Sequence, residues 1–337
     1  MKAYELQKNE GFAALTQVDR PSPALGPLDV RVRVRAASLN FRDLVIARNA
    51  KNSRAAPIVP MSDGAGEVIE IGSAVKSLRT GERVAANFFP TWIDGPPTPS
   101  YHANALGGSV DGMLAEQVVL PESAWVKLPA HLSFEEGATL PCAGVTAWNA
   151  LFESASLRPG DTVLVQGTGG VSIFALQLAK AAGAKVVATS QSAEKRERAR
   201  KLGADHTIDY KATPKWGAAA HEWTGGAGVD VVVEVGGPGT FDQSMAALRY
   251  AGTMSILGVL TGLRGEVNTY ELFQKGLKVH GVYVGSVAMF ERLNRALTAH
   301  ELHPIVDRVF PFDEARSAYE YLASAQHLGK VVIRVAD

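Results

Sequence analysis

Six short apolar runs alternate with helical segments after about residue 130, and this pattern constrains the fold more than any other feature of the chain. The runs are rich in Val and Ile, which is typical of strands buried on both faces in a parallel sheet. Strands that alternate with helices, here Val171–Ala182 and Ala193–Leu202, indicate a doubly wound α/β domain. The predicted strands are Thr162–Gln166, Lys185–Thr189, His206–Asp209, Val229–Val235, Thr253–Leu257 and Leu277–Val284.

The chain from residue 1 to about 125 is predicted to consist of short strands and turns. Leu28–Ala36 alternates apolar with charged side chains, which is the period of a half-buried strand. Gly64–Gly72 and Gly81–Ala85 are two further candidates. The stretch Phe88–Gly108 is rich in Pro and Gly, so we expect a long surface loop, and loops of this length are often functional.

Two more extended segments, Val306–Phe310 and Lys330–Val335, lie near the end of the sequence with a helical stretch between them.

A glycine turn follows the first strand of the α/β domain and opens a helix, which is the context that a dinucleotide-binding turn requires. The first glycine allows the tight turn, and the second lets the backbone approach a pyrophosphate. The helix N-terminus supplies N–H groups and a favourable dipole. Ser172 stands where the motif usually has its third glycine, and a turn without any ligand is the alternative. The turn consists of Gly167, Thr168, Gly169, Gly170 and Val171.

The end of the second strand bears on the choice of cofactor. An NAD site usually has Asp or Glu about 20 residues after the glycine motif. Here the strand ends in Thr189-Ser190-Gln191-Ser192, without an acid, and Lys195 and Arg196 follow. A neutral pocket flanked by cations suits a 2′-phosphate, so we predict NADPH rather than NADH. The alternative is that both cations belong to the solvated face of a surface helix.

Composition and charge argue against several classes of protein. Lys plus Arg and Asp plus Glu are each 34, so the basic excess typical of nucleic-acid binders is missing. No apolar run approaches the roughly 20 residues of a membrane span. The opening MKAYELQ lacks the apolar core of a signal peptide, and Cys142 is the single cysteine. We therefore expect a cytoplasmic protein with no nucleic-acid or membrane partner.

Six segments together resemble the medium-chain dehydrogenase/reductase superfamily, and in particular its zinc-free quinone oxidoreductase, or zeta-crystallin-like, branch. The resemblance extends over essentially the whole chain. It implies a GroES-like β-rich catalytic domain formed by residues 1–127 and 287–337, and a Rossmann NADP-binding domain formed by residues 128–286. The segments are Asn40–Leu44, Met61–Val68, Leu140–Ala150, Gln166–Gly183, Leu202–Tyr210 and Gly329–Ile333.

The resemblance also bears on zinc. Zinc alcohol dehydrogenases use Cys, His and Cys as catalytic ligands, and the matching positions here are Asn40, Ser62 and Cys142. An amide and a hydroxyl are poor zinc ligands, and a lone thiolate cannot hold the ion, so we expect no metal site. The four-cysteine lobe that holds a structural zinc is missing as well. Cys142 is then predicted to be a small buried apolar side chain, and His300 and His303 to lie on a surface turn.

The resemblance implies roles for particular residues. Asn40 would lie beside the nicotinamide and the substrate and act as the catalytic hydrogen-bond donor. Asp63 is interpreted as structural, and Lys330 either as a phosphate ligand or as a surface lysine. Tyr101 and His102 are candidates for a proton donor. The implied cofactor-binding residues are Asn40, Thr146, Gly167, Thr168, Gly169, Gly170, Val171, Ser190, Lys195, Tyr210, Gly236, Gly258, Val259, Val284 and Gly285.

The predicted function is that of an NADPH-dependent oxidoreductase, without zinc, which transfers hydride to a conjugated carbonyl acceptor such as a quinone or enone. Two alternatives remain open at this point: an enzyme of the alcohol/carbonyl type, and a non-catalytic NADPH-binding protein. The expected partners are a small carbonyl or quinone substrate and a second copy of the chain. The homodimer that the resemblance implies would form through the edge strand Leu277–Val284.

Overall fold

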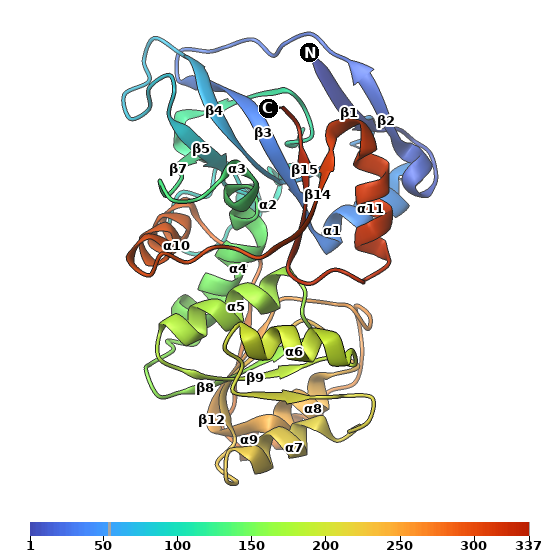
Figure 1. Ribbon diagram of the computed structural model, residues 1–337, viewed down its shortest axis with the longest axis vertical. Helices are drawn as coiled ribbons and strands as arrows, with labels where there is room; N and C mark the ends of the chain where they lie inside the picture. Colours follow the sequence, from blue (N-terminus) through green and yellow to red (C-terminus); the bar gives the residue numbers. More distant parts are fainter. Residues whose placement is uncertain (53–54, 337) are drawn as a thin grey trace. The chain divides into compact units, whose positions relative to one another are not determined.

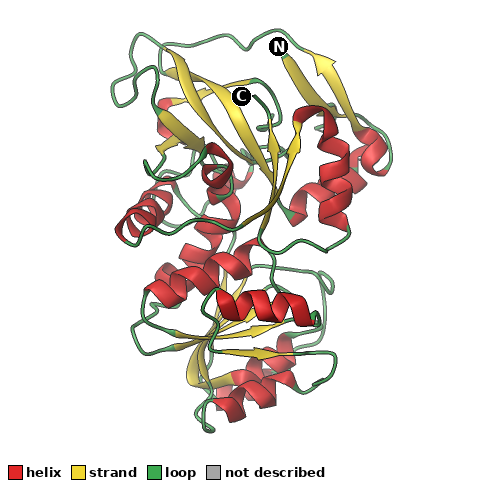
Figure 2. Cartoon of the chain, in the orientation of Figure 1, coloured by secondary structure: helices red, strands yellow, loops and turns green. Residues whose placement is uncertain are grey.

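The computed structural model describes residues 1–52 and 55–336. The chain forms two compact units, one made of Met1–Val145 with Gly285–Asp337, and the other of Thr146–Val284 (Figure 1). The first unit is rich in strands, and the second alternates strands with helices (Figure 2).

The second unit contains a six-stranded sheet in which every neighbouring pair is parallel. The order β10-β9-β8-β11-β12-β13 is that of a Rossmann sheet, and all six predicted strands are confirmed. Strands β8 and β9 match their predicted bounds, β10 and β11 end one residue earlier than predicted, β12 starts and ends earlier, and β13 is shorter at both ends. The strands are β8 (Thr162–Gln166), β9 (Lys185–Thr189), β10 (His206–Ile208), β11 (Val229–Glu234), β12 (Leu248–Ile256) and β13 (Lys278–Gly281).

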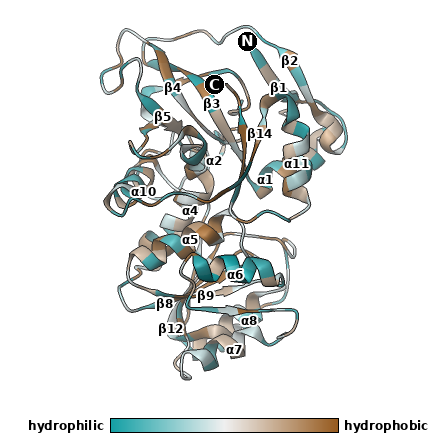
Figure 3. Ribbon diagram, in the orientation of Figure 1, coloured by the Kyte–Doolittle hydropathy of each residue, from teal (hydrophilic) through white to brown (hydrophobic). Residues whose placement is uncertain are grey.

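Helices cover both faces of this sheet, with α5 and α6 on one face and α7, α8 and α9 on the other (Figure 1). Helix α5 is apolar and largely buried, whereas α6 buries only Ala199 and is strongly hydrophilic (Figure 3). The Ser192 hydroxyl caps α6 by accepting from the N–H of Lys195 at 3.2 Å. The helices are α5 (Gly170–Ala181), α6 (Ala193–Lys201), α7 (Trp216–Trp223), α8 (Phe241–Ala247) and α9 (Thr269–Gln274).

The first unit is built on a seven-stranded sheet to which both ends of the chain contribute. Strand β15 pairs antiparallel with β3, and β14 pairs parallel with β15, so the C-terminal segment belongs to the same sheet as the N-terminal strands. A separate pair, β1 (Lys2–Leu6) with β2 (Leu15–Asp19), completes the strands. The sheet contains β3 (Asp29–Leu39), β4 (Asp63–Ile71), β5 (Arg83–Ala86), β6 (Gln117–Pro121), β7 (Trp125–Lys127), β14 (Val306–Pro311) and β15 (Lys330–Arg334).

The helices of this unit are short except for α10 and α11. Helix α11 packs on β14, β15 and α1, and its buried face includes Tyr319 and Leu322. No helix of the described residues is long and apolar enough to span a bilayer. The helices are α1 (Phe41–Arg48), α2 (Pro99–His102), α3 (Phe134–Gly137), α10 (Val287–Ala299) and α11 (Ala315–Ala323). Helix α4 (Val145–Trp148) begins at the last residue of this unit and otherwise belongs to the second.

Residues 128–145 pack with the first unit, so the boundary lies after Val145 rather than after residue 127. The reason is helix α3, which contacts β3, β4 and β15. Phe134 lies under the Arg83 guanidinium, with 4.6 Å from Cζ to the ring centroid. The second boundary, before Gly285, lies two residues earlier than expected.

The stretch Phe88–Gly108 is only partly the surface loop that its Pro and Gly content predicts. Phe88, Phe89 and Trp92 are fully buried and pack edge-to-face or tilted against one another, and Leu106 is buried as well. Tyr101, on α2, stacks on Trp92 with 5.9 Å between ring centroids. Aromatic rings bury the first end of this stretch and Leu106 buries the second, whereas residues 93–97 remain exposed.

Candidate functional site

The glycine turn after β8 has the geometry of an anion-binding helix N-terminus. Gly167 has a φ of +69°, which favours glycine, and Gly169 is the extended N-cap of α5. No described atom lies within 4 Å of a Cβ built at either glycine. No side chain of the described residues caps α5, so its first N–H groups remain available to an anion such as a phosphate.

Ser172 explains the departure from the usual glycine motif. Its side chain is buried, and its hydroxyl donates to the carbonyl oxygen of Gln166 at 2.6 Å. The small side chain keeps α5 close to β8 and adds a hydrogen bond between helix and strand. These residues therefore fit a dinucleotide, although the roles of Gly167 to Val171 as direct contacts stay predictions.

Two further turns lie at the same, carboxyl, edge of the sheet. Gly236 follows β11, and Gly258 with Val259 follows β12. A Cβ at Gly258 would lie 2.1 Å from the Val235 carbonyl oxygen, so the two turns approach closely there. The N–H and the hydroxyl of Thr261 both donate to the Gly236 carbonyl oxygen at 2.8 Å. The structure thus brings the predicted residues of these two turns together.

The residues predicted for the adenosine end also gather at this edge. The Ser190 N–H donates to the Ile208 carbonyl at 3.0 Å, which joins the ends of β9 and β10, and Tyr210 follows as a half-buried side chain. Arg196 donates to the Ser190 carbonyl at 2.7 Å and to the Asp209 carboxylate at 2.8 Å. Arg196 is thus engaged in holding two strand ends together, and its charge is balanced by Asp209.

Thr146 and Val284 lie near the two ends of the second unit, and both are buried. Val284 has a φ of +59°, which is unusual for a β-branched residue, and the Asn149 amide donates to its carbonyl oxygen at 2.7 Å. Gly285 belongs to the first unit, where a Cβ would meet Val145 and Met289 at under 3 Å.

Asn40 lies in a buried polar cluster of the first unit, together with Lys330 and Asp63. Lys330 is 3% exposed, so its interpretation as a surface lysine is wrong. Its ammonium group donates to the Asn40 amide oxygen at 2.5 Å and to the Leu39 carbonyl at 2.6 Å. The same nitrogen lies 3.8 Å from a carboxylate oxygen of Asp63.

The orientation of the Asn40 amide follows from these contacts. Oδ1 accepts from Lys330, and Nδ2 is buried on the side of the Asp63 carboxylate, whose pKa the Asn40 side chain acts to lower. The Asn40 backbone N–H donates to Asp43 at 2.8 Å, which fixes Asn40 as the N-cap of α1. Burial raises the pKa of Asp43 to about 6, against the opposing effect of Arg42.

Asp63 and Cys142 complete the cluster. Asp63 is fully buried and accepts from the Ser62 hydroxyl at 2.7 Å and from the Cys142 N–H at 3.2 Å. Burial raises the pKa of Asp63, while the Lys330 ammonium acts in the opposite direction. Burial, and next the Asp63 carboxylate, raise the pKa of the Cys142 thiol well above its ordinary value.

These side chains do not fit a catalytic zinc ion. Zinc ligands must be deprotonated and must direct free lone pairs at the metal. The Asn40 oxygen is bound to Lys330 and the Ser62 hydroxyl is bound to Asp63, and a lone thiolate from Cys142 cannot hold the ion. Among the described residues, no group of three or more His, Cys, Asp and Glu side chains could hold a metal ion.

The candidate proton donors Tyr101 and His102 are held by aromatic stacking, Tyr101 on Trp92 and His102 on Phe89 at 5.3 Å between ring centroids. His303 lies on the surface, as expected, and pairs with Glu136 at 2.7 Å.

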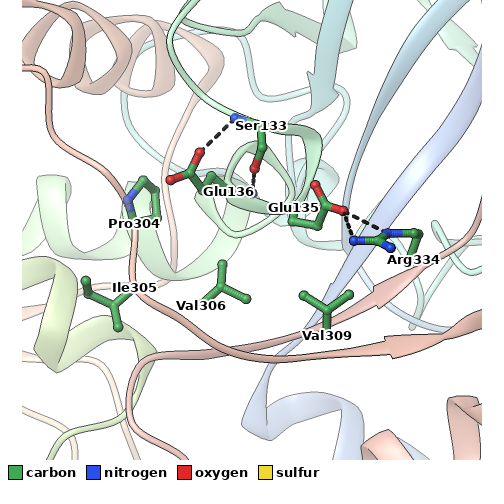
Figure 4. Close-up of a pocket in the computed structure, with 8 residues that line it drawn as sticks. All are labelled: Ser133, Glu135, Glu136, Pro304, Ile305, Val306, Val309 and Arg334. Carbon is green, nitrogen blue, oxygen red and sulfur yellow. Dashed lines mark hydrogen bonds and ion pairs between the residues drawn. The ribbon is translucent and has the colours of Figure 1, made fainter. Parts of the chain in front are cut away.

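A surface hollow of about 610 Å³ lies beside β14 (Figure 4). An ion pair between Glu135 and Arg334 borders it, and Ile305, Val306 and Val309 form its apolar side. None of the predicted site residues lines this hollow, so it is separate from both clusters described above.

Sequence reasoning missed Lys330 as a partner of Asn40, and it missed the buried Gln166 and Glu234 behind the glycine turns. The only signal for Lys330 in the sequence was its place in a segment that resembles the family. Gln166 and Glu234 are polar residues at the ends of otherwise apolar strands, and that position was the available signal.

Two family models match the chain. Residues 26–130 match the alcohol dehydrogenase GroES-like domain, and residues 170–299 match the zinc-binding dehydrogenase family. A zinc-type alcohol dehydrogenase-like protein of Schizosaccharomyces pombe is 46% identical over 96% of both chains. A quinone oxidoreductase-like protein 2 homolog of Nematostella vectensis is 30% identical over 92% of this chain and 82% of its own.

Among solved structures, a putative alcohol dehydrogenase from Sinorhizobium meliloti 1021 superposes with a TM-score of 0.92. It is 40% identical and covers 99% of this chain and 98% of its own. Together with the Rossmann sheet and the strand-rich first unit, these matches show that the chain belongs to the medium-chain dehydrogenase/reductase superfamily of oxidoreductases.

Proposed function

We propose that this chain is an NADPH-dependent oxidoreductase which works without zinc and reduces a conjugated carbonyl acceptor such as a quinone or enone. The observation that carries the proposal is the Lys330 ammonium group, buried against Asn40 and Asp63. It provides a positive charge at the place where the family resemblance puts a metal ion, and it engages the oxygen that Asn40 would offer to one.

The preference for NADPH is supported by the end of β9. No carboxylate follows the strand directly, so none would repel a 2′-phosphate there. Glu194 lies in the first turn of α6, and Asp209, after β10, is engaged by Arg196 and by the N–H groups of Lys211 and Ala212. We propose that Ser190, Lys195 and Tyr210 contact the 2′-phosphate.

The bound cofactor would supply a hydride, and the chain would supply orientation and hydrogen bonds. Reduction of a conjugated acceptor leaves an enolate or hydroquinone anion, and its oxygen needs a donor rather than a Lewis acid. In this proposal the donor is the Asn40 amide, whose oxygen is held by Lys330 and whose Nδ2 is buried in the structure. Positioning by fixed donors is the main source of rate enhancement in such a site.

An enzyme of the alcohol/carbonyl type is the second candidate, and the names of two relatives favour it. Oxidation of a simple alcohol requires loss of the hydroxyl proton, which zinc assists in the metal-dependent enzymes. The engaged side chains around Lys330 argue against that chemistry here. A non-catalytic NADPH-binding protein is the remaining alternative, and turnover of any acceptor would exclude it.

We further propose that the protein forms a homodimer through β13. This strand is at the edge of the Rossmann sheet, and all four of its residues are exposed. Apolar side chains nearby are exposed too, including Val279, Tyr283 and Phe273. An exposed edge strand with apolar neighbours is a surface that proteins normally cover.

The experiment is to follow nicotinamide absorbance with NADPH and with NADH, against a benzoquinone, a polycyclic ortho-quinone, an enone and a simple aldehyde. We expect turnover of a quinone or the enone, with a lower KM for NADPH than for NADH. Turnover of the aldehyde alone would contradict the proposed acceptor class. A lower KM for NADH would contradict the proposed cofactor.

A further inference from the structure

A buried carboxylate lies at the carboxyl end of β11. Glu234 is fully buried, and its Oε1 accepts from the N–H of Gly236 at 2.7 Å and of Gly237 at 2.9 Å. The Thr240 hydroxyl donates to the same oxygen at 2.6 Å. No cationic side chain of the described residues pairs with Glu234, so hydrogen-bond donors alone compensate for its burial.

The second oxygen of Glu234 faces Gln166, the residue just before the Gly167 turn. The Gln166 amide donates to Glu234 Oε2 at 2.6 Å, and the Ser244 hydroxyl donates to that oxygen as well. The Gln166 amide oxygen accepts from the N–H groups of Val235 and Gly236, both at 3.2 Å. Each side chain thus binds the turn that follows β11, and they bind each other.

The network reaches three turns at the carboxyl edge of the sheet. Gln166 leads directly into the Gly167 turn, and Glu234 leads into the turn at Gly236 and Gly237. The carbonyl oxygen of Gly236 accepts from Thr261, which belongs to the turn after β12. Gly167 and Gly237 have φ values of +69° and +86°. Glycine turns lose much conformational freedom on ordering, so they need side chains that hold them.

We propose that Glu234 and Gln166 form a buried positioning pair that preorganises the cofactor-binding turns. This inference rests on the proposed nicotinamide cofactor, because the three turns contain its predicted contacts. Neither side chain touches the cofactor in this scheme. The pair acts by holding the backbone N–H and carbonyl groups of the turns in a single arrangement before the cofactor binds.

The donors and acceptors of the pair are matched, and this gives a sharp test. Glu234→Gln places an amide donor against the Gln166 amide donor. Gln166→Glu places two carboxylates against each other. The double variant Gln166→Glu/Glu234→Gln restores a donor facing an acceptor, and it keeps acceptors for the N–H groups of Val235, Gly236 and Gly237.

The first measurement is the dissociation constant for NADPH, from nicotinamide fluorescence, at a temperature where every variant is folded. We expect each single variant to raise this constant about tenfold, because a buried donor or acceptor is left unmatched. The double variant is expected to return to within about threefold of the wild type. The second measurement is amide hydrogen exchange at Gly236 and Gly237 without cofactor, which we expect to be faster in both single variants only.

Ser255→Ala is the matched control. The Ser255 hydroxyl is buried in the same sheet and donates to the Ala150 carbonyl at 2.9 Å, so it takes no part in the hydrogen bonds of Glu234 and Gln166. Its loss is expected to lower thermal stability without changing cofactor affinity. The same pattern in the two single variants, lower stability with unchanged affinity and exchange, would overturn the positioning role.

The outcomes separate this inference from the proposed function. In the proposed scheme the three turns contact parts that NADH and NADPH share, so tighter binding of NADH by the wild type would overturn the proposed cofactor and leave the pair intact. Failure of the double variant to restore affinity, with the wild type binding NADPH, would overturn the pair and leave the proposed cofactor intact.

Discussion

Lys330 carries the buried positive charge of the polar cluster in the first unit. A buried ammonium group is stable only where charges and acceptors compensate the loss of water, and here Leu39, Asn40 and Asp63 provide them. Removal of Lys330 leaves the Asp63 carboxylate buried without a counter-charge, so substitution can test this ion pair.

Lys330→Met keeps the length of the side chain and removes its charge. We expect the free energy of unfolding to fall by about 3–5 kcal/mol, because Asp63 loses its counter-charge in a buried site. Denaturant unfolding measures this change. The double variant Lys330→Met/Asp63→Asn should recover a large part of it, and equal stability of Lys330→Met and wild type would contradict the buried pairing.

The buried carboxyl group of Asp43 should make the stability of the protein depend on pH. Burial raises the pKa of this carboxyl to about 6 from an ordinary value of 3.8. Because the folded-state pKa is raised, ionisation opposes folding: the cost is absent below about pH 4 and complete above about pH 6. Asp43→Asn keeps an acceptor for the Asn40 N–H and cannot ionise.

Unfolding of both proteins should therefore be measured between pH 4 and pH 7. We expect the variant to gain on the order of 3 kcal/mol relative to the wild type across this range. A constant difference between the two proteins would show that Asp43 does not titrate there.

At the scale of single elements, the turn between β9 and α6 sets the proposed cofactor preference. Lys195→Ala is expected to raise the dissociation constant for NADPH about tenfold, as for loss of a hydrogen bond to a charged group, and to leave that for NADH unchanged. Arg200→Ala is the control, because Arg200 lies on the same helix and pairs with Glu197 on the surface. An equal loss for both cofactors would contradict the role of Lys195.

Elements with a strong local signal could be predicted from the sequence, and the others could not. Strands β8 and β9 match their predicted bounds because short Val-rich runs between glycines have few alternatives. The Pro and Gly content of the 88–108 stretch predicted a surface loop, although its first residues include the aromatic side chains that the structure buries. Strands β6 and β7 are short and carry no clear alternation, so their pairing depends on tertiary contacts.

Within the candidate sites, too, continuous segments could be predicted from the sequence and pairs of distant residues could not. The glycine turn and the end of β9 are continuous segments, so their chemistry can be read directly. The hydrogen bond between Lys330 and Asn40 joins residues 290 positions apart, and Gln166 lies 68 positions from Glu234. No local pattern specifies such side-chain pairs, because they depend on which strands become neighbours.

At the scale of the whole molecule, the proposed dimer gives a direct prediction. Val279→Lys places a charge in the middle of the exposed edge strand β13, where like charges from two copies would meet. We expect the wild type to sediment as a dimer at micromolar concentration and the variant as a monomer. A wild-type monomer would exclude the proposed interface.

The central claim is that catalysis needs no zinc because Lys330 already occupies the place of a cation beside Asn40 and Asp63. The most direct measurement is the rate of NADPH oxidation with a quinone or enone, before and after dialysis against a chelator, with zinc content determined in parallel. The account predicts the same rate in both samples and no stoichiometric zinc. Loss of the rate on dialysis, restored by one equivalent of Zn²⁺, would contradict it.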